Sequence, residues 1–215
     1  MRVSTSNHRW TVAALAVAAV MTSACGEVAR TGRSPAYLVI DVLEGSSGVR
    51  PGEFATTVSS DVVTLVSQTI NGQQVRVPTI YTDVGRVSLR VGLKNPGQAG
   101  QVTTPGPLSD ITVQRYRVVY RRADGRNTQG VDVPYAFDGA FTITVPASGT
   151  ASGTFDLVRG AAKAEAPLAT LRGNGGAQFI GTIAEVTLYG RDQAGNDVSV
   201  TGTISVSFAD FGDPA

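Results

Sequence analysis

The chain has 215 residues, of which 42% are hydrophobic and 16% are charged, and its formal net charge at pH 7 is +1. A charge this close to balance gives no electrostatic reason to expect nucleic acid as a partner, because phosphate backbones are bound by an excess of Lys and Arg. The chain contains one cysteine and one histidine, which excludes a disulfide within the chain.

The N-terminal 24 residues have the layout of a secretory signal peptide. Arg2 and Arg9 charge the start, Trp10–Met21 form an uncharged apolar run, and small residues precede Cys25. The apolar run has about a dozen residues, short of the roughly 20 that a membrane-spanning helix needs. The sequence therefore predicts export and removal of residues 1–24, followed by a short polar tether over 25–35.

The segment Met21–Gly26 (MTSACG) resembles the bacterial lipobox, in which small residues precede a cysteine that becomes acylated. The resemblance implies a lipid anchor on Cys25 in the cell envelope, facing the periplasm or the exterior. Gly26, where inner-membrane lipoproteins have Asp, favours the outer membrane. The family pattern has Leu where Thr22 stands. Cleavage by an ordinary signal peptidase, or a retained signal anchor, are the alternatives.

From Ala36 onward the pattern is that of β-strands. In residues 86–94, Val87, Leu89 and Val91 alternate with polar side chains, which is typical of an antiparallel strand with one face on a core. Asn71-Gly72 predicts a tight hairpin, because both residues tolerate positive φ. The nine predicted strands cover 37–43, 62–69, 74–81, 86–94, 111–121, 141–145, 153–159, 178–190 and 198–208.

The connections are rich in Gly, Pro, Ser and Asp, and loops are predicted over 45–60, 95–109 and 123–139. One short helical turn is expected within 161–171, and Pro167 argues against any more helix there. Nine short strands with frequent turns predict one all-β domain over 36–212, an antiparallel β-sandwich.

The segment Ala184–Asn196 (AEVTLYGRDQAGN) resembles the D-x-A-G-N turn found near the end of bacterial immunoglobulin-like domains. The resemblance implies an immunoglobulin-like fold and a surface or periplasmic module that is usually not catalytic. The Cys-Trp-Cys core of antibody domains is absent from this sequence. The likeness concerns fold, which does not by itself give function.

Catalytic chemistry is limited by residue types. Removal of the signal peptide takes the only histidine, His8, so a Ser-His-Asp triad, a Cys-His pair and a His/Cys zinc site are excluded. Three acids of the 123–139 loop, Asp124, Asp132 and Asp138, could form a glycosidase pair or simply cap turns.

Two groups of residues are candidates for ligand binding. Arg115, Arg117 and Arg121 share one face of the 111–121 strand, either as a cationic stripe for an anionic partner or as surface arginines paired with acids. Tyr135 and Phe137 are either a ligand platform or a cap on the core.

The turn of the last hairpin carries oxygen ligands. Asp192, Asn196 and Asp197 suit either a weak calcium site or an ordinary hairpin turn. No other cofactor or metal is expected.

The function expected from the sequence is a lipid-anchored, non-catalytic binding or structural module of the cell envelope. Its partner would be an envelope protein or glycan, and not nucleic acid. The alternatives are a carboxylate-dependent envelope hydrolase and a subunit of a larger envelope assembly.

Overall fold

The computed structural model describes residues 32–212. The signal segment, Cys25 and most of the tether lie outside the described residues. Within them, the all-β prediction is confirmed, and twelve strands are formed rather than nine. The strands are β1 (Ala36–Ser46), β2 (Thr57–Asp61), β3 (Thr64–Ile70), β4 (Gln73–Thr79), β5 (Asp83–Leu93), β6 (Gly97–Gln98), β7 (Gln101–Val102), β8 (Ile111–Arg121), β9 (Phe137–Val145), β10 (Thr150–Val158), β11 (Phe179–Asp192) and β12 (Asp197–Ala209).

Three strands lie in segments for which the sequence predicted only loops. Four of the five residues of β2 fall within 45–60, and β6 and β7 fall within 95–109. β2 has five residues, three of them Ser or Asp, and β6 and β7 have two residues each. Segments this short contain no measurable alternation, so pairing with other strands decides their structure and local pattern does not.

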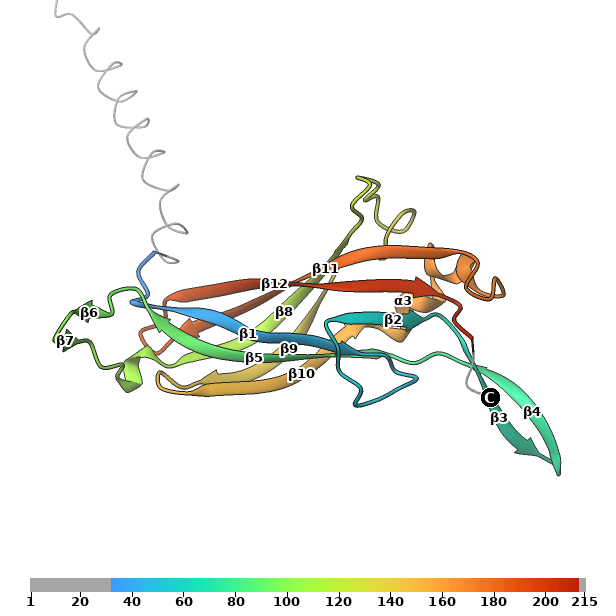
Figure 1. Cartoon of the computed structure of the whole chain (residues 1–215), viewed down its shortest axis with the longest axis horizontal. Helices are drawn as coiled ribbons and strands as arrows, with labels where there is room; N and C mark the ends of the chain where they lie inside the picture. Colours follow the sequence, from blue (N-terminus) through green and yellow to red (C-terminus); the bar gives the residue numbers. More distant parts are fainter. Residues whose placement is uncertain (1–31, 213–215) are drawn as a thin grey trace, which may run out of the picture.

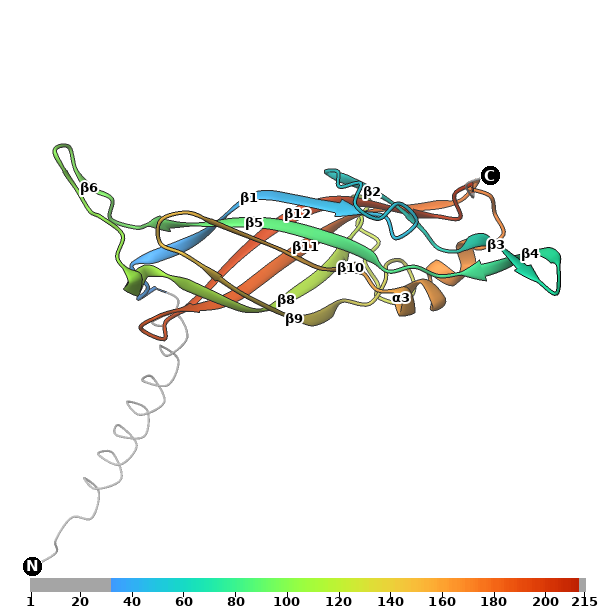
Figure 2. The same cartoon turned by 90° about the horizontal axis from the view of Figure 1, so that it is seen from below.

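Two larger sheets form the body of the molecule. One has the order β1-β5-β10 and the other has the order β2-β12-β11-β8-β9, while β3-β4 and β6-β7 are separate hairpins. The antiparallel prediction needs one correction, because β2 runs parallel to β12, pairing Thr57 with Ser205 and Asp61 with Ala209. Figures 1 and 2 show the long strands of both sheets running along an elongated body.

The predicted alternation is confirmed in the strands where it was clearest. In β5, Val87 and Leu89 are fully buried while Arg90 is exposed. In β12, Ile204, Val206 and Phe208 are buried. The buried faces of both sheets contribute to one hydrophobic cluster. This cluster is the core that a chain without disulfides needs.

Contacts across this core connect the two sheets directly. The ring centroids of Tyr116 in β8 and Phe155 in β10 are 5.0 Å apart. The buried Tyr120 hydroxyl donates a 2.6 Å hydrogen bond to the carbonyl oxygen of Leu157, and burial, with the nearby Asp83, raises the pKa of Tyr120 above its usual value. Gly45 lies where any side chain would collide with Val58 and Leu157, so glycine is required for this close approach.

The two small hairpins project from opposite ends of the body. The β3–β4 hairpin extends from the end of the body at which β12 finishes, and β6–β7 extends from the end at which β1 starts (Figures 1 and 2). The β3–β4 turn confirms the sequence prediction, because Asn71 and Gly72 have φ values of 52° and 81° and join Ile70 to Gln73 directly.

Short helical segments interrupt the β-structure. They are η1 (Pro107–Ser109), α3 (Gly160–Ala164) and η2 (Leu168–Leu171). Helical structure within 161–171 is confirmed, but the structure forms two short pieces where the sequence predicted one turn, with Pro167 between them.

Helix α3 carries an ion pair into the core. Lys163 Nζ lies 2.8 Å from Asp83 Oδ1 at the start of β5, and both side chains are fully buried. Asp83 Oδ1 also accepts a 2.8 Å hydrogen bond from the Gly48 amide. Asp83 Oδ2 has no hydrogen-bond partner within residues 32–212. The pair fixes α3 and residue 48 against β5, at the cost of removing two charges from water.

Lys163→Ala is expected to lower the free energy of unfolding by about 3–5 kcal/mol, because the Asp83 charge would stay buried without its cation. Lys163→Met combined with Asp83→Leu is expected to recover part of this loss, since no charge is then buried. Urea unfolding at neutral pH measures both, with Lys94→Ala at the exposed second lysine as the control. A double variant no more stable than Lys163→Ala would contradict the dominant role of the ion pair.

Candidate functional site

The outer face of β8 carries the predicted cationic stripe. Arg117 Nη1 lies 2.7 Å from Asp138 Oδ2, and Arg115 Nη1 lies 3.3 Å from Asp138 Oδ1. Arg117 and Asp138 are direct neighbours in the β8–β9 register. One carboxylate of β9 therefore serves two arginines of β8, and the positive charge of this part of the face is largely compensated.

The other end of the stripe is compensated by β11. Arg121 Nε lies 2.7 Å from Glu185 Oε2, and the guanidinium of Arg115 lies 3.7 Å above the Tyr189 ring centroid. Arg115 and Tyr189 line a hollow of about 300 Å³ with Arg191 and Asp197. Exposed pairs of this kind stabilise a protein by at most about 1 kcal/mol each. Ligand binding by the three arginines stays a prediction, and cross-strand pairing already accounts for them.

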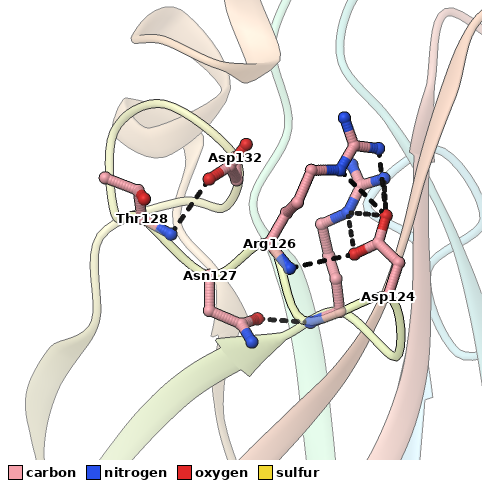
Figure 3. Close-up of polar contacts among 6 residues, drawn as sticks. Asp124, Arg126, Asn127, Thr128 and Asp132 are labelled. Atoms are coloured by element: carbon pink, nitrogen blue, oxygen red, sulfur yellow. Dashed lines mark hydrogen bonds and ion pairs between the residues drawn. The ribbon is translucent and has the colours of Figure 1, made fainter.

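The acids of the β8–β9 connection stabilise the loop itself (Figure 3). Asp124 forms ion pairs with Arg122 at 2.7 Å and with Arg126 at 2.9 Å. Hydrogen bonds from Arg122, and after them those from Arg126, hold the pKa of Asp124 well below its usual range. A general acid needs the opposite shift.

The next acid of this loop has a similar local role. Asp132 Oδ2 accepts a 3.1 Å hydrogen bond from the Thr128 amide (Figure 3). Asn127 Oδ1 accepts a 2.7 Å hydrogen bond from the Arg122 amide in the same loop. Together with Asp138 on β9, all three acids proposed from the sequence as a hydrolytic set are engaged in local hydrogen bonds or ion pairs.

The two aromatic residues predicted as a platform take different positions. Phe137 is 4% exposed and packs edge-on against Tyr116, with ring centroids 6.1 Å apart. Tyr135 is 57% exposed. Both line a hollow of about 170 Å³ beside α3, where the Arg159 guanidinium lies 3.9 Å above the Phe137 ring centroid. Phe137 thus belongs to the core, whereas Tyr135 lies on the surface at the edge of the hollow.

The candidate calcium residues form the turn between β11 and β12. Asp192 is buried, and its Oδ1 accepts hydrogen bonds from the amides of Ala194 at 3.0 Å and Asn196 at 2.8 Å. Burial disfavours its charged form, but the hydrogen bonds from Asn196, Ser34 and Ala194 outweigh burial and lower the pKa of Asp192. Asp197 pairs with Arg191 at 2.7 Å. The carboxylates of Asp192 and Asp197 thus already accept hydrogen bonds from donors within the protein.

Asp192→Ala is expected to lower the free energy of unfolding by about 1.5–3 kcal/mol at pH 7, because it removes a charged hydrogen-bond acceptor. A lowered pKa stabilises the fold above the unfolded-state value of about 3.9, and this stabilisation is lost as the pH falls through the folded-state pKa. The difference from wild type should therefore shrink in acid, as measured by urea unfolding from pH 7 to pH 2. The matched control Asp197→Ala should cost less than about 1 kcal/mol. A difference independent of pH would contradict this account.

A larger hollow, of about 390 Å³, lies where no site was predicted from the sequence. It is enclosed by residues 47–56, hereafter the 47–56 loop, together with β2 and the residues after β12. Its lining comprises Gly45, Ser47, Val49, Arg50, Glu53, Phe54, Ala55, Thr57, Val58, Ser59, Asp61, Phe211 and Gly212. This hollow is hereafter the Asp61 pocket.

The 47–56 loop is held in place by hydrogen bonds from the body of the protein. Ser46 Oγ accepts a 3.1 Å hydrogen bond from the Gly52 amide and donates a 2.8 Å one to the Arg50 carbonyl. Gly45 and Ala55 exchange two backbone hydrogen bonds of 2.8 and 2.9 Å. With the Gly48 amide bound to Asp83, the wall of the pocket is fixed at several points along the loop.

Asp61 is the buried acid of this pocket, with 6% of its surface exposed. Thr64 Oγ1 donates a 2.6 Å hydrogen bond to Oδ2, and the Phe211 amide donates a 3.1 Å one to Oδ1. Burial raises the pKa of Asp61, and the neighbouring charge of Asp210 adds to the rise. The sequence contained no signal for this site, because loop 47–56, β2 and residue 211 meet only in the folded chain.

In comparisons with known proteins, no family model matches the chain, and neither a curated protein nor a solved structure matches it. Within residues 32–212, no helix combines the length and the hydropathy that a membrane crossing requires. The same residues contain no group of three or more His, Cys, Asp or Glu side chains placed to hold a metal ion.

Proposed function

We propose that this protein is a lipid-anchored binding module of the cell envelope, built as an immunoglobulin-like β-sandwich and acting without catalysis. The observation that carries the proposal is the arrangement of the two ends. β1 starts at one end of the body, whereas β2 and the last residues of β12 lie toward the end that carries the β3–β4 hairpin (Figures 1 and 2). The Asp61 pocket is lined by residues of β2 and by Phe211 and Gly212, which follow β12.

The strand order supports an immunoglobulin-like fold. The N-terminal part of the chain supplies β1 to the three-stranded sheet and β2 to the five-stranded sheet, where β2 runs parallel to the last strand. The chain then crosses between the sheets from β5 to β8, from β9 to β10 and from β10 to β11. Greek-key crossings of this kind characterise immunoglobulin-like sandwiches.

An anchor at Cys25 would give the two ends different roles. Six residues separate Cys25 from Gly32, so the two Cα atoms are at most about 25 Å apart when this segment is fully extended. The end that carries residue 32 would therefore stay close to the membrane, and the β3–β4 hairpin would point away from it. Recognition on loops at the far end of a sandwich is a common arrangement.

The charges of the described surface support an envelope protein or glycan as the partner and not nucleic acid. Arg115, Arg117 and Arg121 all have acidic partners. Nucleic acid binding draws on Lys and Arg whose charge is free to displace counterions. A nearly neutral surface with hollows and exposed hairpins is better suited to short-range contacts with a protein or glycan than to long-range attraction of a polyanion.

Two alternatives each have one observation in their favour. A subunit of a larger assembly is favoured by the β3–β4 hairpin, where Ile70 and Val75 are 46% and 40% exposed. A hydrolase is favoured by Asp61 and Glu53, which line one pocket, with the pKa of Asp61 raised. Glycan hydrolysis that is abolished by both Asp61→Asn and Glu53→Gln would establish the second alternative.

The anchor is tested by metabolic labelling with a fatty-acid analogue. Wild-type protein is expected to carry the label and to sediment with membranes, because acyl chains contribute about 0.8 kcal/mol per buried methylene. Cys25→Ala removes the acylated atom and is expected to lose the label entirely. Label that persists in the variant would refute the anchor on Cys25.

The orientation is tested by site-specific photocrosslinking in the native envelope. A photoreactive residue at Glu53, on the Asp61 pocket, is expected to capture a discrete envelope partner. The same residue at Gln98, on the β6–β7 hairpin at the opposite end, serves as the matched control and is expected to capture lipid or nothing. Capture of the partner at Gln98 and not at Glu53 would contradict recognition at the far end.

A further inference from the structure

The described chain has three buried aspartates, and they are compensated in different ways. Asp83 has the buried Lys163 ammonium at 2.8 Å. Asp192 receives enough hydrogen bonds that its pKa is lowered despite burial. Asp61 takes part in none of the ion pairs formed within residues 32–212, and its hydrogen bonds do not offset its burial.

The surroundings of Asp61 add negative charge. Asp210 is close enough to disfavour ionisation of Asp61, and Glu53 lines the same pocket. The one basic residue of the lining, Arg50, lies 3.9 Å from Glu53, and both side chains are more than 70% exposed. The pocket therefore has a buried carboxylate with a second acid near it, and a rim on which Arg50 and Glu53 compensate one another. A cation at Asp61 would neutralise a charge that the protein itself leaves unpaired.

The rest of the lining is suited to an apolar stem. Val49, Phe54, Ala55, Val58 and Phe211 supply apolar side chains to the wall. The Arg86 guanidinium lies 4.2 Å above the Phe54 ring centroid, so this ring already interacts with one cation. A hollow of about 390 Å³ is at the small end of the size range of ligand pockets, about 300–1,000 Å³.

A metal ion fits this pocket less well. Calcium takes six to eight oxygen ligands, most of them carboxylate or carbonyl groups around one point. Asp61 already accepts hydrogen bonds at both oxygens, and residues 32–212 offer no cluster of three acids for a metal. An ammonium group needs only hydrogen-bond acceptors, and a carboxylate has room for about four donors.

We propose that the Asp61 pocket binds a primary ammonium group on an alkyl stem, with the ammonium at Asp61 and the stem along Phe54 and Val58. This inference rests on the proposed binding function and names the ligand chemistry of that site. A lysine side chain of an envelope partner and a free alkylamine share this chemistry. The two sources differ in whether a peptide backbone contributes to binding.

The test uses the purified full-length protein and ligand-observed NMR titrations with n-butylamine and with acetyl-Gly-Lys-Gly-amide. Both probes are expected to bind if the free amine suffices, and only the peptide if its backbone is required. The norleucine analogue of the peptide, which has the stem without the charge, is expected to bind at least about tenfold more weakly, the usual size of a lost charged hydrogen bond.

Two variants locate the binding. Asp61→Asn removes the charge and is expected to weaken binding by about tenfold or more. Asp61 also accepts hydrogen bonds from Thr64 and Phe211, so Asp61→Asn could disturb the fold as well as the charge. Ser59→Trp tests the site independently, because Ser59 is an exposed residue of the lining. The indole should fill the pocket without touching the core and should weaken binding. Asp156→Asn, at an exposed acid of β10, is the matched control and should bind as wild type.

Several results would overturn the inference. Equal binding of the lysine and norleucine peptides would show that the charge is irrelevant, and unchanged binding in Ser59→Trp would place the site elsewhere. Calcium binding that requires Asp61 and displaces the amine would make the pocket a metal site. None of these outcomes affects labelling of Cys25 or crosslinking at Glu53, so failure of the ligand assignment and failure of the proposed function can be told apart.

Discussion

The buried carboxylate of Asp83 connects three parts of the chain that lie far apart in the sequence. It begins the central strand of the three-stranded sheet, binds the ammonium of Lys163 on α3, and accepts the amide of Gly48 at the base of the 47–56 loop. Removing two charges from water is costly, so this position tolerates little displacement. Through the Gly48 amide, the 47–56 loop in the wall of the Asp61 pocket is thus attached to this buried ion pair.

On the outer face of the five-stranded sheet, charged side chains are compensated by pairing at the surface and not by burial. They pair across neighbouring strands, as Arg117 does with Asp138 and Arg121 with Glu185, and threonines pair in the same way, Thr112 with Thr144 and Thr187 with Thr201. Such contacts set register more than they add stability. Asp61 differs from these residues. The exposed charges of this face have partners of opposite charge on neighbouring strands, whereas the buried Asp61 takes part in none of the ion pairs formed within residues 32–212.

Part of the fold could be predicted from side-chain alternation and local backbone restrictions. The buried faces of β5 and β12 follow from alternation, and the β3–β4 turn follows from the positive φ that Asn71 and Gly72 tolerate. Of the two helical pieces around Pro167, the sequence predicted only one turn. β2 could not be predicted, because its five residues gain their partner from β12, about 150 residues later in the chain. The Asp61 pocket was missed for the same reason, since Thr64 is local to Asp61 but Phe211 is not.

The local sequence also left open whether some residues that are close together in the chain are buried or exposed. Tyr135 and Phe137 are two residues apart, and only the start of β9 decides that one is exposed and the other buried. Arginines on one face of β8 indicated either a binding stripe or paired side chains, and only the strand order, with β9 on one side and β11 on the other, brings acids to them. In both cases the strand pairing decides the environment of the side chain, and the period of the sequence does not reveal that pairing.

The parallel contact between β2 and β12 has a consequence for how the molecule is assembled. β12 is the last strand within residues 32–212, and it alone joins β2 to the rest of the five-stranded sheet. Until β12 is in place, residues 57–61 have no neighbour in that sheet, and the wall of the hollow around Asp61 cannot close. Assembly of this pocket therefore depends on a contact between two segments that lie about 150 residues apart in the chain.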